Sequence, residues 1–71
     1  MLLQLLLYEA RKQAGYTQKD IADKLGISET TYRQKELGQN DFKLSECYKI
    51  AKILNKEISD LFTNTTSQNE R

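Results

Sequence analysis

The chain has 71 residues with 11 basic and 10 acidic side chains, so its formal net charge is +1, and 38% of the residues are hydrophobic. This size fits one small domain with a modest core, and no apolar run reaches the roughly 18 residues that a membrane span needs. A single cysteine and the lack of histidine exclude an internal disulfide, a cysteine-based metal cage, the common zinc sites and histidine-based catalysis.

The first helix is predicted over residues 2–14, ending at Gly15. Its expected inward face consists of five residues: Leu3, Leu6, Leu7, Ala10 and Ala14. Leu2 and Leu5 fall outside this face, so they either lie on the domain's own surface or form a contact with a partner or second copy. The apolar stretch Met1–Leu7 lacks the basic start of a signal peptide, and we therefore expect a cytoplasmic protein.

Two short helices joined by a tight turn are predicted between Thr17 and Gly38. Thr17 is a favourable N-cap, with Asp20 placed to complete a capping box. Gly26 ends the first of these helices in a left-handed conformation, and Ser28 caps the next, which runs to about Glu36. The residues expected to pack between the two helices are Ile21, Ala22, Leu25 and Tyr32. Two such short helices with so tight a connection cross steeply, as in a helix-turn-helix.

The remaining chain predicts a loop over residues 39–43, a helix over about 43–54 and a short helix over about 57–62. The inward face expected for the longer helix is formed by Leu44, Cys47, Ala51 and Leu54, with Tyr48, Ile50 and Ile53 beside it. Cys47 is expected to be a small core residue, and Asn55 a left-handed residue after the helix. We expect residues 1–62 to form one domain, and the polar residues 63–71 to be a disordered tail.

Several residues match a known pattern: Arg11, Gly15, Gln18, Ala22, Gly26, Ile27, Tyr32, the run Glu36-Leu37-Gly38, and then Ala51, Leu54, Ile58, Leu61 and Phe62. In them the chain resembles the phage repressor/Cro-like (XRE-type) helix-turn-helix family over roughly residues 3–62. The resemblance implies a compact all-α bundle of about five helices, a lambda-repressor-like domain that binds DNA, usually as a dimer. It also implies a structural salt bridge between Arg11 and Glu36.

In a helix-turn-helix, the second helix lies in the major groove and its N-terminal residues meet the base edges. The predicted base contacts are Glu29, Thr30, Thr31, Arg33 and Gln34. Arginine suits guanine or a phosphate, glutamine suits adenine, threonine suits the thymine methyl group, and glutamate accepts from cytosine. In the family, the positions of Glu29, Thr30 and Gln34 are among the usual base readers. The alternative for all five is a solvated polar helix face.

Phosphate contacts are predicted at Gln18, Lys19, Ser28, Asn40 and Lys43. The dipole and free amides at a helix start favour a phosphate beside Gln18 and Lys19, and the family pattern adds a supporting role for the matching glutamine. Asn40 and Lys43 equally fit simple solvation of a loop.

Three charged residues depart from the family pattern: Lys35, Asp41 and Lys56, the last of which stands where a small apolar residue is usual. Lys35 stands at a usually apolar position, so either its stem lies along the core edge or the end of that helix is rotated. Asp41 stands at a loop position that is often basic. With so few cationic groups at the expected DNA face, we predict modest affinity and a shallow salt dependence.

The expected function is that of a sequence-specific regulator of transcription, a repressor that binds double-stranded DNA at a pseudo-palindrome as a homodimer. The last helix or the N-terminal leucines are the candidate dimer surfaces. The alternative is a protein-interaction module of the same fold, such as an antitoxin or a regulatory subunit with a protein partner. No paired carboxylates or other catalytic constellation stand out, and we expect no enzymatic activity, metal or cofactor.

Overall fold

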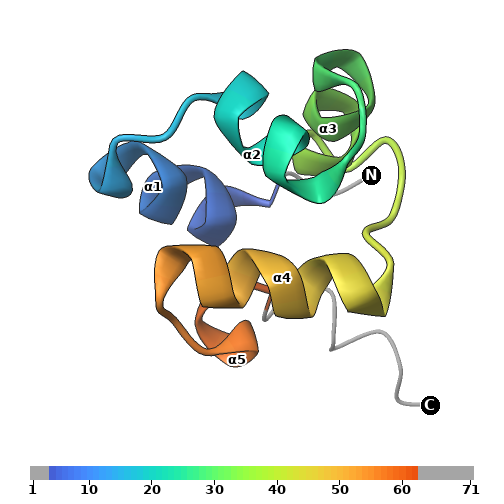
Figure 1. Cartoon of the computed structure of the whole chain (residues 1–71). Helices are drawn as coiled ribbons and strands as arrows, with labels where there is room; N and C mark the ends of the chain where they lie inside the picture. Colours follow the sequence, from blue (N-terminus) through green and yellow to red (C-terminus); the bar gives the residue numbers. More distant parts are fainter. Residues whose placement is uncertain (1–3, 63–71) are drawn as a thin grey trace, which may run out of the picture.

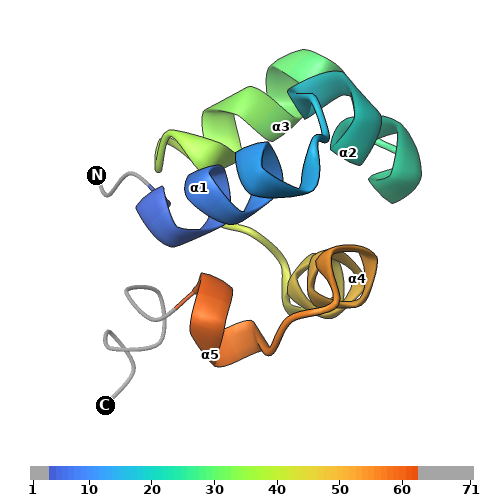
Figure 2. The ribbon, with the colours of Figure 1, turned by 90° about the vertical axis from the view of Figure 1, so that its left-hand side faces the viewer.

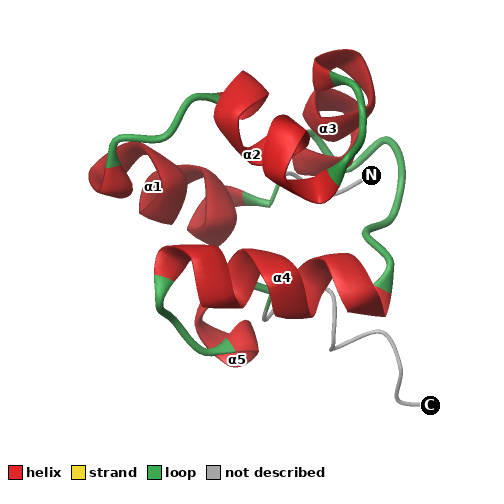
Figure 3. Ribbon diagram, in the orientation of Figure 1, coloured by secondary structure: helices red, strands yellow, loops and turns green. Residues whose placement is uncertain are grey.

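The computed structural model describes residues 4–62, and within this range the chain forms five helices and no strand (Figure 3). The helices are α1 (Leu5–Ala14), α2 (Gln18–Leu25), α3 (Glu29–Glu36), α4 (Leu44–Leu54) and α5 (Ile58–Leu61). The predicted all-α bundle is therefore confirmed. Leu2, Leu3 and the expected polar tail lie outside the described residues.

Helices α2 and α3 cross steeply on one side of the molecule, and α4 lies across from them (Figure 1). Helix α1 lies between α3 and α5 (Figure 2) and packs against both, as well as against α4. The short α5 folds back onto α4 and α1. This arrangement holds α2 and α3 on a base made by the other three helices. None of the helices in the described part of the chain is long and apolar enough to cross a membrane.

The helix boundaries follow the capping residues that the sequence predicts. The Thr17 hydroxyl accepts from the Asp20 amide at 3.0 Å, and the Thr17 amide donates to the Asp20 carboxylate at 2.9 Å. The Ser28 hydroxyl accepts from the Thr31 amide at 3.0 Å. Between these two caps, Gly26 has a φ of 77°, which a residue with a Cβ adopts only at a cost. Local capping chemistry thus sets the ends of α2 and the start of α3.

The core joins all five helices. Its buried hydrophobic residues are Leu7, Ala10, Ile21, Ala22, Leu25, Tyr32, Phe42, Cys47, Ile50, Ala51, Leu54, Leu61 and Phe62. Phe42 comes from the loop before α4 and stacks edge-to-face on Tyr32 and on Phe62, with ring centroids 5.9 and 5.4 Å apart. Such aromatic pairs stabilise beyond the area they bury. Cys47 is buried, as predicted, and burial raises the pKa of its thiol.

The predicted inward faces of α1 and α4 are wrong at their edges. Leu6 is 40% exposed, Leu44 is 67% exposed, and Ala14 is exposed at the end of α1. Ile50, which the sequence placed beside the inward face of α4, is fully buried. At about 100° per residue, the buried face of α4 is centred on Ile50 and Leu54, so that Leu44 in the first turn lies at its rim.

Candidate nucleic-acid interface

The short connection between α2 and α3 brings the two helices into direct contact. Ala22 is fully buried, and the Ile27 amide donates to its carbonyl at 3.0 Å. Tyr32 is fully buried on the inner side of α3. The packing of these residues fixes one face of α3 inward and leaves the opposite face to solvent.

The outward face of α3 is polar. Glu29, Thr30 and Arg33 are exposed, whereas Thr31 and Gln34 are partly buried. The hydroxyl of Thr31 accepts from the Ser28 hydroxyl at 2.8 Å, so that this pair is engaged in the cap of α3. All five predicted base-contact residues therefore belong to α3, and three of them are exposed.

Arg33 is held by two neighbours. Its Nη2 lies 3.6 Å from the Glu29 carboxylate one turn earlier in α3, and its Nε donates to Oε1 of Gln18 at 3.3 Å. Gln18 is the first residue of α2 and Arg33 belongs to the last turn of α3, so this hydrogen bond joins the start of one helix to the end of the other. The side chains of Gln18, Glu29 and Arg33 thus form one polar cluster at the surface.

The other predicted contacts have hydrogen-bond or ion-pair partners of their own. The Asn40 amide group donates to Oε1 of Gln34 at 3.1 Å, which places the loop after α3 against the same helix. Lys19 is exposed and lies 3.5 Å from Asp23 on α2. Lys43 precedes α4, where its backbone amide donates to Glu46 at 2.9 Å. The predicted sites at Asn40 and Gln34 are therefore brought together, whereas Lys43 belongs to the start of another helix.

A buried ion pair between α1 and α3 lies on the inner side of the predicted DNA-binding surface. Arg11 donates to both carboxylate oxygens of Glu36, from Nε at 2.9 Å and from Nη2 at 3.1 Å. Glu36 also accepts from the Tyr32 hydroxyl at 2.7 Å and from Nε2 of Gln18 at 3.0 Å. Burial alone would raise the pKa of Glu36, but these hydrogen bonds outweigh it and hold the pKa below the usual value. The salt bridge that the resemblance implied is present.

A second buried ion pair was not predicted. Nζ of Lys35 lies 2.7 Å from Glu46 on α4, and each side chain is only 10% exposed. Nζ also lies 6.0 Å from the centre of the Phe42 ring. Neither of the two predictions for Lys35 described this arrangement. The sequence signal that could have indicated it was Lys35, a charged residue at a position that is usually apolar in the family pattern.

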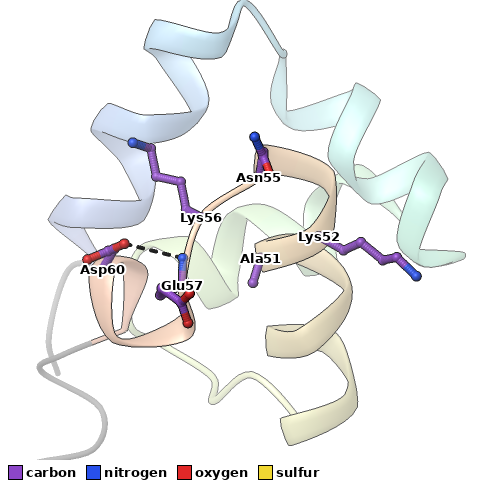
Figure 4. Close-up of a pocket in the computed structure, with 6 residues that line it drawn as sticks. All are labelled: Ala51, Lys52, Asn55, Lys56, Glu57 and Asp60. Carbon is purple, nitrogen blue, oxygen red and sulfur yellow. Dashed lines mark hydrogen bonds between the residues drawn. The ribbon is translucent and has the colours of Figure 1, made fainter.

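Two hollows in the described part of the chain are lined by residues outside α3. One, of about 340 Å³, is lined by Ala51, Lys52, Asn55, Lys56, Glu57 and Asp60. Figure 4 shows the Lys56 side chain extending toward α1 and the Lys52 side chain extending in the opposite direction. The Asp60 carboxylate accepts a hydrogen bond from the Glu57 amide at 3.2 Å. Its charged groups have both signs. No group of three potential metal-binding side chains occurs among residues 4–62.

Residues 7–61 match the sequence model of a family described as helix-turn-helix. Similar proteins include an uncharacterized HTH-type transcriptional regulator of Archaeoglobus fulgidus, 39% identical over 76% of this chain and 77% of the relative. Another of that description, from Methanocaldococcus jannaschii, is 44% identical over 65% of this chain and 70% of its own length. A third, from Methanothermobacter thermautotrophicus, is 34% identical over 80% of this chain and 84% of its own.

Proposed function

The chain belongs to the helix-turn-helix family, and from this membership we propose that it is a sequence-specific, double-stranded DNA-binding regulator of transcription. The observation that carries the proposal is the one-sided α3, capped by Ser28, packed inward through Tyr32 and polar on its outer face. In this motif the second helix enters the major groove with its N-terminal end leading.

The base-contacting residues in this proposal are Glu29, Thr30, Thr31, Arg33 and Gln34. Gln34 accepts from Asn40 through its oxygen, which leaves its NH₂ group to donate to a base acceptor. The Thr31 hydroxyl is engaged with Ser28, so its methyl group is the part offered to a thymine methyl. Glu29 disfavours phosphates and accepts from cytosine N4. These assignments predict which base each substitution would affect.

The backbone contacts in this proposal come from the start of α2 and from the loop after α3. Their residues are Gln18, Lys19, Ser28, Asn40 and Lys43. Lysine contributes to affinity by displacing counterions, and only Lys19 and Lys43 in this set are cationic. Because few ions are released, the logarithm of the binding constant falls only shallowly with the logarithm of salt concentration.

We further propose that residues 1–62 act as one DNA-binding domain and that two copies bind a pseudo-palindrome with half-sites about one helical turn, ~34 Å, apart. Bound across a promoter, such a dimer acts as a repressor by occupying the DNA. A single module of this size makes too few contacts to bind one half-site tightly, which is the reason for proposing two.

Selection of duplexes from randomised DNA by the purified protein tests the proposal, followed by binding of the selected duplex across a salt series. We expect an enriched inverted repeat and a slope equivalent to fewer than about eight released ions. The double variant Arg33→Ala, Gln34→Ala should lose about 1–3 kcal/mol for each base contact removed. The matched control is Lys12→Ala, Gln13→Ala, the exposed cation–glutamine pair on α1. A folded protein that enriches no sequence would refute the proposal.

A second candidate is a protein-interaction module, favoured by exposed apolar side chains on a nearly neutral chain. The large ones are Leu5, Leu6, Tyr8, Leu37, Leu44 and Tyr48. A partner held through these residues would tolerate the Arg33→Ala, Gln34→Ala variant unchanged. Loss of a co-purifying partner in Leu5→Ser, Leu6→Ser, with DNA binding retained, would establish this use separately.

A further inference from the structure

The outer side of α4 combines two exposed apolar side chains with two lysines. Leu44 and Tyr48 are 67% and 62% exposed, more than any other large hydrophobic residue in the described part of the chain. Leu44, Tyr48 and Lys52 follow one another at intervals of four residues, so their side chains form one ridge along the helix. Lys49 lies beside this ridge and is also exposed. We call these four residues the α4 outer face.

The α4 outer face is open to solvent within residues 4–62. The opposite side of the helix carries its buried residues, which are Glu46, Cys47, Ile50, Ala51 and Leu54. Helix α4 packs against α1, α2 and α5, and Figure 2 shows it nearly end-on at the edge of the molecule. None of the ion pairs within the described residues involves Lys49 or Lys52. Both lysines are therefore available to a partner.

The charge on the α4 outer face has one sign. Glu46 is the acidic residue of α4, and it lies on the buried side, where it is paired with Lys35 at 2.7 Å. A carboxylate brought to Lys49 and Lys52 from outside thus meets two cations without repulsion from an exposed acid of the same helix. Such a face complements an acidic partner and disfavours a basic one.

A second copy of the chain does not complement this face. In a two-fold symmetric dimer the same surface pairs with itself, so Lys49 and Lys52 of the two copies would come together without a carboxylate. Single-stranded nucleic acid also fits less well, because its binding sites stack successive bases on aromatic rings. The α4 outer face has Tyr48 as its aromatic residue, and Leu44 offers no ring for a base. An apolar and acidic protein segment uses all four side chains.

The α4 outer face points away from the outer side of α3. Lys35 and Glu46 meet between the two helices. Each outer side lies beyond this contact: Arg33 is about 160° around α3 from Lys35, and Tyr48 is about 160° around α4 from Glu46. In Figure 1, α2 and α3 accordingly lie above and α4 below. A partner bound on α4 leaves the outer side of α3 open.

We propose that the α4 outer face binds an acidic amphipathic helix of a partner protein. Apolar side chains one turn apart in the partner pack on Leu44 and Tyr48, and carboxylates beside them pair with Lys49 and Lys52. The partner is a helix because residues 4–62 contain no strand edge on which an extended segment could add a strand. Docking is a property of the free protein, whereas its use by a DNA-bound regulator rests on the proposed function.

The first test selects peptides from a displayed library of randomised sequences against the immobilised full chain. We expect the enriched peptides to carry net negative charge and apolar residues at helical spacing. A synthetic copy of one enriched peptide, titrated into isotope-labelled protein, should shift the backbone NMR signals of Tyr48, Lys49 and Lys52 most. No enrichment, enrichment of basic peptides, or shifts confined to other helices overturns the proposal.

The second test removes the apolar ridge. Leu44→Ser, Tyr48→Ser should weaken binding of the synthetic peptide at least about 30-fold, as for central residues of an interface. Both positions are exposed, so the fold should be retained; if circular dichroism shows otherwise, Tyr48→Ser alone replaces the pair. The matched control is Leu5→Ser, Tyr8→Ser, an exposed leucine–tyrosine pair on α1, which should leave peptide affinity unchanged. Equal losses in both variants refute the assignment to α4.

The third test reverses the charge. Lys49→Glu, Lys52→Glu should weaken peptide binding at least about tenfold at low salt and remove its weakening by added salt. The matched control is Lys12→Glu, Lys24→Glu, two exposed lysines on α1 and α2, which should change the affinity less than about threefold. An equal effect of both variants shows general charge attraction and overturns a site on α4.

Three further measurements decide between occupants and functions. Oligothymidylate binding or self-association in sedimentation that is lost in Leu44→Ser, Tyr48→Ser, without loss of peptide binding, overturns the proposal in favour of nucleic acid or a second copy. Selection of randomised duplex DNA is run on the wild type in parallel. A bound peptide without a selected duplex refutes the proposed function and leaves docking on α4 established, whereas a selected duplex without a bound peptide refutes docking alone.

Discussion

Replacement of Lys35 by Met tests the energetic role of the second buried ion pair. Methionine keeps an unbranched stem beside Phe42 but removes the charge that faces Glu46. Breaking a buried pair from one side typically costs about 3–5 kcal/mol. Here each side chain keeps 10% exposure, and Glu46 still accepts from the Lys43 amide. We therefore expect a loss of about 2 kcal/mol in the free energy of unfolding, or a fall of roughly 8–16 °C in Tm.

The opposite substitution, Glu46→Met, should cost more. It leaves the Lys35 ammonium beside Phe42 without its carboxylate and also removes the acceptor for the Lys43 amide at the start of α4. Loss of such a cap adds about 1 kcal/mol, for a total of about 3 kcal/mol. In the double variant no buried charge is left unpaired, so its loss should return to about 1 kcal/mol, smaller than for either single variant.

Urea unfolding at neutral pH, followed by far-UV circular dichroism, measures all four proteins. Lys49→Met, at an exposed position on α4, controls for the general effect of replacing lysine by methionine. If the losses in the two single variants add within about 0.5 kcal/mol in the double variant, the two charges are not coupled and this reasoning is refuted.

Three further predictions follow from other features. Arg11→Ala should cost about 3–5 kcal/mol because it leaves the Glu36 carboxylate buried without its main partner, and a variant that melts like the wild type would show that the pair is not needed. Because the folded pKa of Glu36 lies below the ordinary 4.5, its contribution is present above about pH 4.5 and lost as the pH falls through the folded value; acid titration of the unfolding free energy should stay level down to about pH 5 and then drop. Gly26→Ala should cost about 1 kcal/mol in urea unfolding, since a Cβ there meets no atom within 4 Å but must adopt a φ of 77°.

Features set by neighbours in the chain were predictable from the sequence. Local hydrogen bonds and backbone sterics determine the helix ends. They set the N-caps at Thr17 and Ser28 and the left-handed conformations of Gly26 and of Asn55, whose φ is 57°. Tyr32 was also predictable as buried, because it is the apolar residue of α3 and is placed to pack against the apolar face of α2.

Features that depend on contacts between elements far apart in the chain were not predictable from the sequence. Leu44 follows the apolar spacing of α4, but the face that packs against the other helices is centred on Ile50 and Leu54, which leaves Leu44 at its rim. The pairing of Lys35 with Glu46 required the loop that carries Phe42 to bring α3 and α4 together. At the candidate interface the sequence identified Gln18 and Arg33 separately, but their hydrogen bond depends on the crossing of α2 and α3, which no spacing in one helix reveals.

The division of α3 into an inner and an outer side also bears on how such a protein changes over evolutionary time. Tyr32, Lys35 and Glu36 face inward, while Glu29 and Thr30 are exposed, and substitution of exposed residues usually changes stability by less than about 0.5 kcal/mol. Under the proposed function, new recognition preferences can therefore arise at Glu29 and Thr30 without loss of the scaffold. Arg33 is less free to vary, because a successor must also suit Gln18, and a lineage that changes one is expected to change the other.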